Sequence, residues 1–404
     1  KQASRQPNAA SPATRDAALA ALAEGLAADA EQIVAANVLD LERGVRDGMT
    51  QGLQDRLRLT PERVEGLVEA VKVIASLPDP LGHVVREMTL ANGLEVSQIR
   101  VPFGVIGAIY EARPNVTVDI TALALKSGNA VALRGGSAAL ETNKALVEIM
   151  HRALESVGLP AAIVASVDDY GRVGANALMT GRGLIDVLIP RGSAALIETV
   201  VTQSTVPVIE TGAGVVHIFV DASADPASTA EIVHNAKVQR PSVCNSVETV
   251  LLHREALEGV LPGMVAKLLE SGVTIHADDT VCALVPDAVA ATPEVWGREA
   301  LSLDISLKVV DSLDEALEHI HTYSTGHTES ILTSDSDNAE RFVQEVDSAA
   351  VMVNASTRFT DGGEFGFGAE VGISTQKLHA RGPMGLPELT STKWIVRGNG
   401  QVRA

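Results

Sequence analysis

The sequence predicts an α/β protein with two doubly wound lobes and a small β arm. Short apolar runs alternate with helical segments from Gly104 onward, and the alternation starts again after Ser223. A separate hairpin pattern surrounds Asn92-Gly93. Strand–helix alternation is typical of parallel sheets, because a parallel connection must carry the chain back across the sheet, usually as a helix. We therefore expect two helix-covered parallel sheets and one antiparallel projection.

The composition fits a protein of two or three domains with an aliphatic core. The chain has 404 residues, of which 46% are hydrophobic and only 3% are aromatic. Since a domain takes about 150 residues, this length suggests two or three of them. Small and branched aliphatic side chains must then fill the core, which suits helices packed on buried strands.

Charge and cysteine content restrict the function classes. The formal net charge of −19 argues against binding to nucleic acid or to anionic membranes, since both rely on clustered Lys and Arg. No apolar run reaches the ~20 residues of a membrane helix. The two cysteines, Cys244 and Cys282, are too few for a disulfide framework. We therefore expect a cytoplasmic protein.

The first part of the chain is expected to be helical and to end in a hairpin. Residues 9–76 carry apolar side chains at helical spacing, and Thr60-Pro61 is typical of a capped helix start. Residues 88–102 then alternate apolar and polar side chains around Asn92-Gly93, which predicts a two-residue hairpin turn. Because the hairpin lies outside the main core, we expect an arm at about 86–102 that pairs with another subunit.

The strands expected in the two lobes are short apolar runs between helical segments. They are Val105–Tyr110, Ala130–Arg134, Ile163–Val167, Leu184–Ile189 and Val206–Ile209 in the first lobe, and Thr249–His253 at the start of the second. Runs of this length suit buried parallel strands. The expected domains are 1–222 for the first lobe with the arm, 223–360 for the second lobe, and 361–404 for a return to the first lobe that ends in a strand.

Cys244 is a candidate nucleophile. It lies in a polar turn between an expected helix and an expected strand, a position where a thiol can be exposed. Backbone N–H groups of the turn, together with Arg240, would favour its thiolate. A lone cysteine is more often a buried, inert residue, and Cys282 in its apolar segment fits that description. Composition and spacing alone leave both interpretations of Cys244 open.

Several segments together resemble the aldehyde dehydrogenase superfamily. Val101-Pro-Phe-Gly-Val-Ile-Gly107, followed by Arg113-Pro-Asn115, resembles its strand and oxyanion-asparagine loop, and the Cys244 turn resembles its nucleophile turn. Within the superfamily, the similarity is greatest to the γ-glutamyl phosphate reductases. It lies in Tyr110–Asn115, Gln239–Asn245, Val353–Gly366 and Gly372–Gly385, and it extends over essentially the whole chain. The resemblance implies an aldehyde-dehydrogenase-like fold with a cofactor-binding first lobe and a catalytic second lobe.

The same resemblance implies NADPH-dependent reduction of L-glutamate 5-phosphate to L-glutamate 5-semialdehyde, with release of phosphate, in proline biosynthesis. Cys244 would form a thioester with the substrate, and the Asn115 side chain with the Cys244 backbone N–H would stabilise the oxyanion. Asn115 is equally suited to cap the following helix. Glu210 stands where the superfamily carries its general base. Because the reduction needs no water, Glu210 would act as a positioning group on the cofactor side or as a residual base.

The resemblance also implies cofactor residues at the ends of two strands. Arg134-Gly135-Gly136-Ser137 replaces the superfamily's Lys-Pro-Ser-Glu, whose Glu holds the adenosine ribose of NAD. Ser137 removes repulsion toward a 2′-phosphate and Arg134 offers a cation, so we expect NADPH over NADH, although Gly135-Gly136 is also an ordinary strand-to-helix turn. Gly192-Ser193 corresponds to the turn that binds the pyrophosphate, and Glu299 corresponds to the residue that binds the nicotinamide ribose.

Such a substrate carries an ammonium group, a carboxylate and an acyl phosphate. The residues Ser356-Thr357-Arg358 supply hydroxyls and a cation in one loop. Arg113 and Arg240 are the cations nearest the expected oxyanion donor and the nucleophile. Each arginine taken singly would equally form a surface salt bridge. The sequence has no His, Cys, Asp or Glu cluster with metal-ligand spacing, so no metal is expected.

Two alternatives and two partners complete the expectations. A related acyl-reducing dehydrogenase would use a CoA thioester, against which the polar Ser356–Gly366 loop argues. A nonenzymatic partner of glutamate kinase would have kept the fold, against which the presence of Cys244 and Asn115 argues. We expect a homo-oligomer paired through the 88–102 hairpin and a strand at 391–397. A complex with glutamate kinase would protect the labile acyl phosphate.

Overall fold

The structure is a computed structural model, and it describes residues 1–403. It divides into two compact units. The first contains Lys1–Thr211, Gly366–Gly372 and the described residues from Met384 onward, and the second contains Gly212–Phe365 and Ile373–Pro383. Each unit has its own parallel sheet, as expected for a two-lobed α/β fold. Three segments that the sequence suggested for the first lobe belong to the second unit. They are 212–222, whose strand pairs there, and 361–365 and 373–383 from the expected C-terminal return.

The sheet of the first unit is a four-stranded parallel sheet. Its strands are β3 (Val105–Tyr110), β4 (Ala130–Arg134), β5 (Val164–Ser166) and β6 (Val187–Arg191). Their order is β5-β4-β3-β6, so the chain runs outward from β3 on one side and then crosses to the other. This reversal creates a topological switch point between β3 and β6, where α/β proteins bind ligands beyond the carboxyl ends of the strands.

The strand expected at Val206–Ile209 does not form a regular strand. It is reduced to a single parallel bridge between Val208 and Leu188. Pro207, next to the bridge, has no N–H group to donate, and this prevents a continuous ladder at the edge of the sheet.

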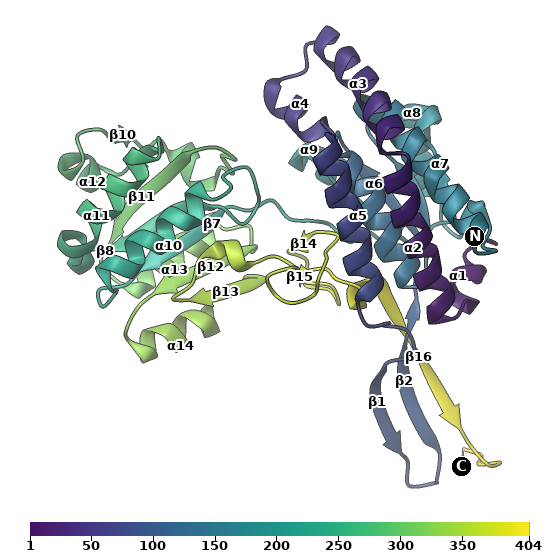
Figure 1. The fold of residues 1–404 in the computed structure, drawn as a ribbon. Coiled ribbons are helices and arrows are strands. Elements are labelled where there is room, and N and C mark those ends of the chain that lie inside the picture. Colours follow the sequence, from purple (N-terminus) through teal and green to yellow (C-terminus); the bar gives the residue numbers. More distant parts are fainter. Residues whose placement is uncertain (404) are drawn as a thin grey trace. The chain divides into compact units, whose positions relative to one another are not determined.

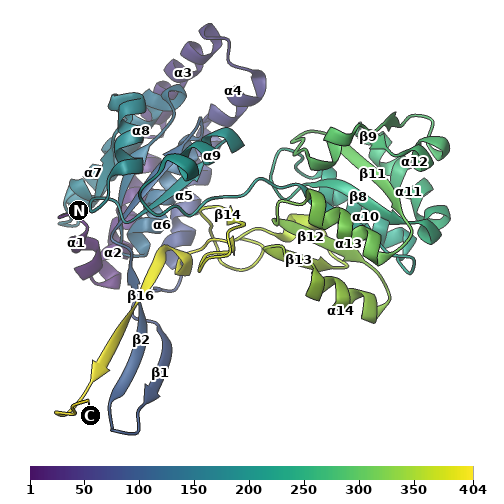
Figure 2. The ribbon, with the colours of Figure 1, turned by 180° about the vertical axis from the view of Figure 1, so that it is seen from behind.

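Helices pack on this sheet and on one another (Figure 1). They are α1 (Arg5–Ala9), α2 (Pro12–Ala28), α3 (Ala30–Arg46), α4 (Gln51–Leu57), α5 (Pro61–Ser76), α6 (Pro114–Lys126), α7 (Leu140–Ser156), α8 (Gly171–Thr180) and α9 (Ala194–Gln203). The last two are seen most clearly from behind (Figure 2). The hydroxyl of Thr60 accepts the N–H of Arg63 at 3.3 Å, and Pro61 is the first residue of α5. The predicted capped start is thus confirmed.

A three-stranded antiparallel sheet projects from the first unit (Figure 1). It contains β1 (Val84–Thr89), β2 (Glu95–Pro102) and β16 (Thr390–Arg397), in the order β1-β2-β16. The expected hairpin and its C-terminal partner strand are present, but the turn is not the predicted two-residue type. The Gly93 N–H donates to the Leu90 carbonyl at 2.9 Å, and Gly93 has a φ of +82°. A turn followed by a left-handed glycine is the usual three-residue hairpin loop.

The sheet of the second unit has seven parallel strands in the order β10-β9-β11-β8-β7-β12-β13. They are β7 (Val216–Val220), β8 (Val247–His253), β9 (Thr274–Ala277), β10 (Val289–Ala290), β11 (Asp304–Val310), β12 (Thr328–Leu332) and β13 (Ala350–Val353). The helices are α10 (Pro226–Val238), α11 (Leu257–Glu270), α12 (Asp279–Leu284), α13 (Leu313–Tyr323) and α14 (Ser336–Glu345). A small sheet of β14 (Ile373–Ser374) and β15 (Gly382–Pro383) belongs to the same unit.

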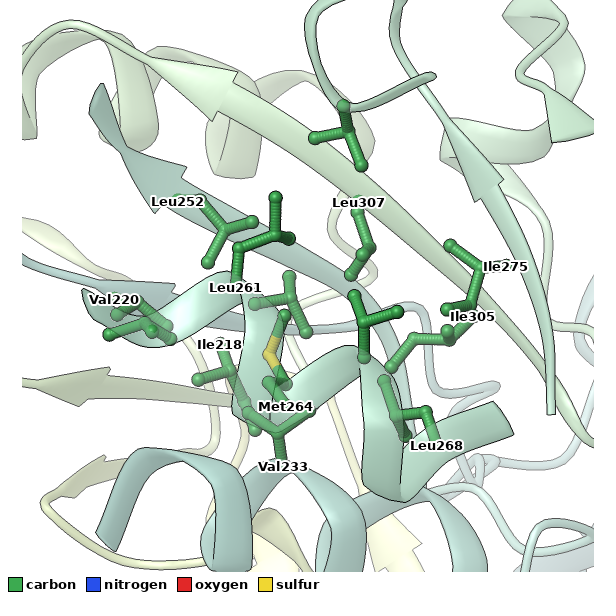
Figure 3. Packing of buried hydrophobic residues seen from close by; sticks show 14 of the residues in the cluster. Ile218, Val220, Val233, Leu252, Leu261, Met264, Leu268, Ile275, Ile305 and Leu307 are labelled. Carbon is green, nitrogen blue, oxygen red and sulfur yellow. The ribbon is translucent and has the colours of Figure 1, made fainter. Parts of the chain in front are cut away.

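Successive residues of the central strands pack on opposite faces of this sheet. Ile218 and Val220 of β7 join α10 and α11 in one core (Figure 3), whereas Phe219 joins α13 and α14 in the other. Burial on both faces explains why these strands are continuous apolar runs in the sequence. The sheet is doubly wound, and because its strands are parallel, the segments that lead into them gather at one edge.

Candidate active site

Cys244 lies at the amino edge of the second unit's sheet. It belongs to the turn 239–246, which joins the end of α10 to the start of β8. The residue is half-buried, and neither cysteine forms a disulfide within the described chain. Cys282 differs in its surroundings, because it lies in α12 and its thiol donates to the Ala277 carbonyl at 3.4 Å. Cys282 is half-buried like Cys244 and not fully buried as expected, and its packing in α12 is what distinguishes it.

Arg358 lies directly against the Cys244 turn. It belongs to a one-turn helix, Thr357–Phe359, that follows β13. Its Nε donates to Gln239 Oε1 at 2.7 Å, and its guanidinium also donates to Asn245 Oδ1. These two acceptors lie before and after Cys244 in the sequence. One guanidinium therefore connects the two ends of the Cys244 turn.

The neighbours of Arg358 hold the same turn by further hydrogen bonds. Thr357 is fully buried, and its hydroxyl donates to the Asn245 carbonyl at 2.7 Å. The Asn245 side chain donates in turn to the Thr360 carbonyl at 2.8 Å. Ser356 is also buried, and its Oγ accepts the N–H of Arg358 at 3.3 Å. The hydroxyls of Ser356 and Thr357, which the sequence suggested for substrate binding, thus bond to the backbone of the loop and of the turn.

Arg358 interacts electrostatically with Cys244 and with charged side chains of both signs. Burial lowers the pKa of Arg358; the charges of Asp361 and Cys244 counteract that shift, and the positive charge of Arg240 adds to it. Arg240 is exposed. A guanidinium stays protonated at physiological pH, so Arg358 places a positive charge near the thiol, and a neighbouring cation is one feature of reactive cysteines.

Gly214 supports the turn from the segment that leads into β7. A Cβ atom on Gly214 would lie 1.5 Å from the carbonyl oxygen of Cys244, so the close approach requires glycine. The Gly214 N–H donates to Glu299 Oε1 at 2.8 Å. Glu299, expected at the nicotinamide ribose, therefore holds the backbone that packs on the Cys244 turn. No local pattern in the sequence revealed Gly214, because its contact is with a remote residue.

Asn115 lies in the first unit, in the first turn of α6 beyond the carboxyl end of β3. Pro114 is the first helical residue and Arg113 is the N-cap residue, so Asn115 does not cap the helix. Asn115 is exposed, and its Nδ2 donates to Asp119 Oδ2 at 3.2 Å. Asp119 is half-buried. Burial raises its pKa to about 6, while the Asn115 hydrogen bond and the charge of Arg191 act in the opposite direction.

The turn Arg134–Ser137 follows β4 at the same edge of the first sheet. Arg134 Nε donates to the Gly171 carbonyl at 3.4 Å. The carboxylate of Asp168 accepts the N–H of Gly135 at 2.6 Å. Burial raises the pKa of Asp168, and its hydrogen bonds and the charge of Arg134 oppose the shift. Asp168, which the sequence did not reveal, thus lies beside the residues expected to bind the 2′-phosphate.

The turn Gly192-Ser193 follows β6 and begins α9. Ser193 is the N-cap residue, since its Oγ accepts the N–H of Leu196 at 3.4 Å. Its own N–H donates to Glu111 Oε2 at 3.0 Å, and a Cβ atom on Gly192 would lie 2.8 Å from that oxygen. A carboxylate therefore lies at the helix N-terminus expected for the pyrophosphate. Sequence reasoning missed Glu111, because β3 and β6 become neighbours only in the folded sheet.

Glu210, possible metal clusters and possible membrane helices remain to be described. Glu210 is half-buried in the segment after the Val208 bridge. Within residues 1–403, no three His, Cys, Asp or Glu side chains form a cluster that could hold a metal ion. None of the helices described is long and apolar enough to cross a membrane.

Comparison with known proteins identifies the family. The model of the aldehyde dehydrogenase family matches residues 1–292. A γ-glutamyl phosphate reductase of Leifsonia xyli subsp. xyli is 64% identical over 395 residues, which cover 98% of this chain and 94% of the relative. One of Clavibacter michiganensis subsp. michiganensis is 65% identical over 389 residues, which cover 96% of this chain and 90% of the relative. The chain belongs to the γ-glutamyl phosphate reductase family.

Solved structures agree with this membership. The crystal structure of γ-glutamyl phosphate reductase from Thermotoga maritima is similar with a TM-score of 0.97 and 45% identity, and the match covers 100% of this chain and 97% of that chain. An acetylating aldehyde dehydrogenase from Geobacillus thermoglucosidasius is 17% identical and shares the fold with a TM-score of 0.71, over 100% of this chain and 96% of that one. The resemblance seen in the sequence and the fold it implied are both confirmed.

Proposed function

We propose that this chain reduces L-glutamate 5-phosphate to L-glutamate 5-semialdehyde with NADPH and releases phosphate, the second step of proline biosynthesis from glutamate. Membership of the γ-glutamyl phosphate reductase family supports the substrate and the cofactor. The observation that supports the chemistry most strongly is the turn around Cys244. Arg358 bonds to residues on both sides of this cysteine and adds positive charge beside it.

Cys244 acts as the nucleophile in this reaction. Its thiolate attacks the C5 acyl carbon, the bond from that carbon to the phosphate oxygen breaks, and phosphate leaves with the electron pair. A γ-glutamyl thioester on Sγ results. NADPH, when bound, supplies the hydride equivalent for the reduction. Sγ then leaves the reduced carbon as a thiolate, which regenerates Cys244, and a thiolate suits both steps because it is a strong nucleophile and a good leaving group.

Negative charge develops on the C5 oxygen in both steps, and fixed donors must stabilise it. We assign this role to the side-chain amide of Asn115 and the backbone N–H of Cys244. Preorganised donors of this kind are effective because they need no reorientation when the charge forms. Loss of one typically costs ~10²–10³ in turnover.

The substrate carries two anionic groups, while the chain has a net charge of −19, so cations must be placed locally. We assign Arg358 and Arg240, at the Cys244 turn, and Arg113, beside Asn115, to the phosphate and the α-carboxylate. A guanidinium binds either group with two parallel hydrogen bonds. Ser356 and Thr357 support Arg358 through the loop that carries it.

The residues at the carboxyl edge of the first sheet fit NADPH. The N–H groups in the first turn of α9 suit the pyrophosphate. Because Gly192 has no side chain, an anion can approach its backbone closely, as the Glu111 carboxylate does: a Cβ on Gly192 would lie 2.8 Å from Glu111 Oε2. We assign Gly192 and Ser193 to the pyrophosphate, and the turn Arg134–Ser137 to the adenosine ribose and its 2′-phosphate. Glu299 and Glu210 are assigned to the nicotinamide side. Glu111 must leave the N-terminus of α9 when the pyrophosphate binds.

The arm supports a homo-oligomer. Large apolar side chains are exposed along it, among them Val84, Met88, Trp394 and Val396, and contiguous exposed apolar surface marks interaction sites. The native mass in solution tests this assignment. A complex with glutamate kinase would protect the labile acyl phosphate, and co-purification of the two proteins tests it. A cytoplasmic location is consistent with two cysteines that form no disulfide.

The reverse reaction tests the proposed function. L-Glutamate 5-semialdehyde and NADP⁺ should give continuous NADPH formation only with inorganic phosphate, because phosphate must cleave the thioester. Cys244→Ser should lower the rate at least ~10³-fold, and the control Cys282→Ser should leave it unchanged. Turnover with CoA in place of phosphate, or normal turnover of Cys244→Ser, would overturn the proposal.

A further inference from the structure

Asp119 has no role in the reaction described above, yet it lies one helical turn from Asn115. Residues four apart are neighbours on one face of a helix, and both belong to α6. Asn115 Nδ2 donates to Asp119 Oδ2 at 3.2 Å. The hydrogen bond connects the proposed oxyanion donor to a half-buried carboxylate.

This hydrogen bond determines which way the amide faces. A primary amide has two N–H donors and one carbonyl acceptor, whereas an ionised carboxylate only accepts. The amide must therefore turn its nitrogen, and not its oxygen, toward Asp119. One N–H is used in this bond, and since Asn115 is exposed, the second N–H remains available to a ligand.

The protonation state of Asp119 is compatible with this arrangement. Burial raises its pKa to about 6, so the carboxylate is mainly ionised at neutral pH. The positive charge of Arg191, at the end of β6, counteracts the shift. The Nε of Arg191 is buried and has no hydrogen-bond partner among residues 1–403. The positive charge of Arg191 thus partly balances the negative charge of Asp119, and this reduces the repulsion between the carboxylate and a nearby oxyanion.

We propose that Asp119 is a positioning residue that holds the Asn115 amide with one N–H presented to the developing oxyanion. The inference rests on the proposed function, in which Asn115 is an oxyanion donor. Without Asp119, the amide is able to turn by about half a rotation and present its carbonyl oxygen, which would repel the oxyanion. Asp119 acts through Asn115 and needs no contact with the substrate.

Two single variants and a double variant test this role by kcat and KM for L-glutamate 5-semialdehyde oxidation. Asp119→Ala should lower kcat about 10-fold or more with little change in KM, because an oxyanion donor acts mainly in the transition state. Asp119→Asn should restore kcat to within a few-fold, since its side-chain oxygen accepts the same N–H. In an Asn115→Ala background, Asp119→Ala should have no further effect, because the group that it positions is gone.

The outcomes that would overturn the inference are distinct from those that would overturn the proposed function. An unchanged kcat in Asp119→Ala, no rescue by Asp119→Asn, or independent effects in the double variant would each exclude the positioning role. A loss of folding would lower activity in any background, so it would not produce the non-additive result. A normal kcat in Asn115→Ala would instead contradict the oxyanion assignment of the proposed function.

Discussion

At the scale of single residues, a buried histidine connects the stability of the second unit to pH. His327 is fully buried ahead of β12. The Thr328 hydroxyl donates to Thr360 Oγ1 at 3.0 Å, so His327 Nδ1 is the donor in its 2.8 Å hydrogen bond to Thr328. Its Nε2 has no partner within residues 1–403. Burial lowers the pKa of His327 to about 4, and the imidazole is therefore neutral in the folded chain.

This burial predicts loss of stability in acid. Below the ordinary pKa of 6.5, the unfolded chain binds a proton at His327 that the folded chain does not bind until about pH 4. As the pH decreases from 6.5 to about 4, the free energy of unfolding should therefore fall by about 1.4 kcal/mol per pH unit. Above pH 6.5, His327 is neutral in both states and causes no loss of stability. His319, whose pKa burial lowers to about 3, adds to the loss.

His327→Asn provides the matched variant, because its amide keeps a donor toward Thr328 and does not titrate. As the pH decreases, the free energy of unfolding of the variant should fall less steeply than that of the parent chain. The two slopes should differ by about 1.4 kcal/mol per pH unit. Urea unfolding at about pH 6 and about pH 5, both between the two pKa values of His327, measures both slopes. Equal slopes for the variant and the parent chain would exclude His327 as a source of the acid sensitivity.

Local motifs made some of the proposed site residues predictable. Cys244 and Asn115 stand in continuous segments that resemble known turns. Asp119 was not singled out from the sequence, although it follows Asn115 by four positions in an expected helix and residues at this spacing are neighbours on one helix face. Glu111 was not predictable in this way, because its partner Ser193 becomes its neighbour only when β3 and β6 pair.

At the scale of elements, the Cys244 turn depends on segments next to other strands of its sheet. Gly214 leads into β7, and Arg358 follows β13. Both contact the turn that leads into β8. Parallel pairing brings Gly214 and the Cys244 turn to the same amino edge.

The segment that follows β13 starts at the opposite edge and returns along β12, where Ser330 Oγ donates to the Ala355 carbonyl at 2.9 Å and the Thr328 hydroxyl donates to Thr360 Oγ1 at 3.0 Å. The geometry around Cys244 therefore depends on the register of the sheet and on this returning segment.

A substitution at Gly214 tests this dependence. In Gly214→Ala, the new Cβ would lie 1.5 Å from the Cys244 carbonyl oxygen, so one backbone segment must move. Displacement of a reacting group by about 1 Å can cost ~10² in rate, and we expect a loss of kcat of that order with the fold retained.

The matched control is Gly263→Ala in α11. Apart from the neighbouring backbone of α11 itself, no described atom lies within 4 Å of the new Cβ, and alanine is the better helix former, so kcat should be unchanged. Steady-state kinetics and circular dichroism of both variants make the comparison. If Gly214→Ala were as active as the control, the turn would not depend on this contact.

Elements were predictable from period and length wherever the chain is locally regular. The expected bounds of β3 and β4 agree with the structure. The hairpin turn differs because Gly93 adopts a left-handed conformation as a third loop residue. The strand at Val206–Ile209 is missing because Pro207 interrupts its ladder.

At the scale of the whole molecule, the two-lobed α/β fold followed from the alternation of strands and helices. The position at which the chain passes from one unit to the other was not predictable from this alternation. β7 joins the second sheet because it pairs with β8 and β12, and such pairing has no local signal. Although the net charge is −19, cations gather locally, since Arg358 interacts electrostatically with Cys244 and Arg240 interacts with Arg358.

The central claim is that the reaction passes through a thioester on Cys244. Mass spectrometry of the protein after incubation with L-glutamate 5-semialdehyde and NADP⁺, without phosphate, tests it most directly. We expect a single burst of NADPH, a γ-glutamyl adduct on the peptide that contains Cys244, and loss of the adduct when phosphate is added. Sustained phosphate-dependent turnover with no adduct on Cys244 would contradict the thioester mechanism.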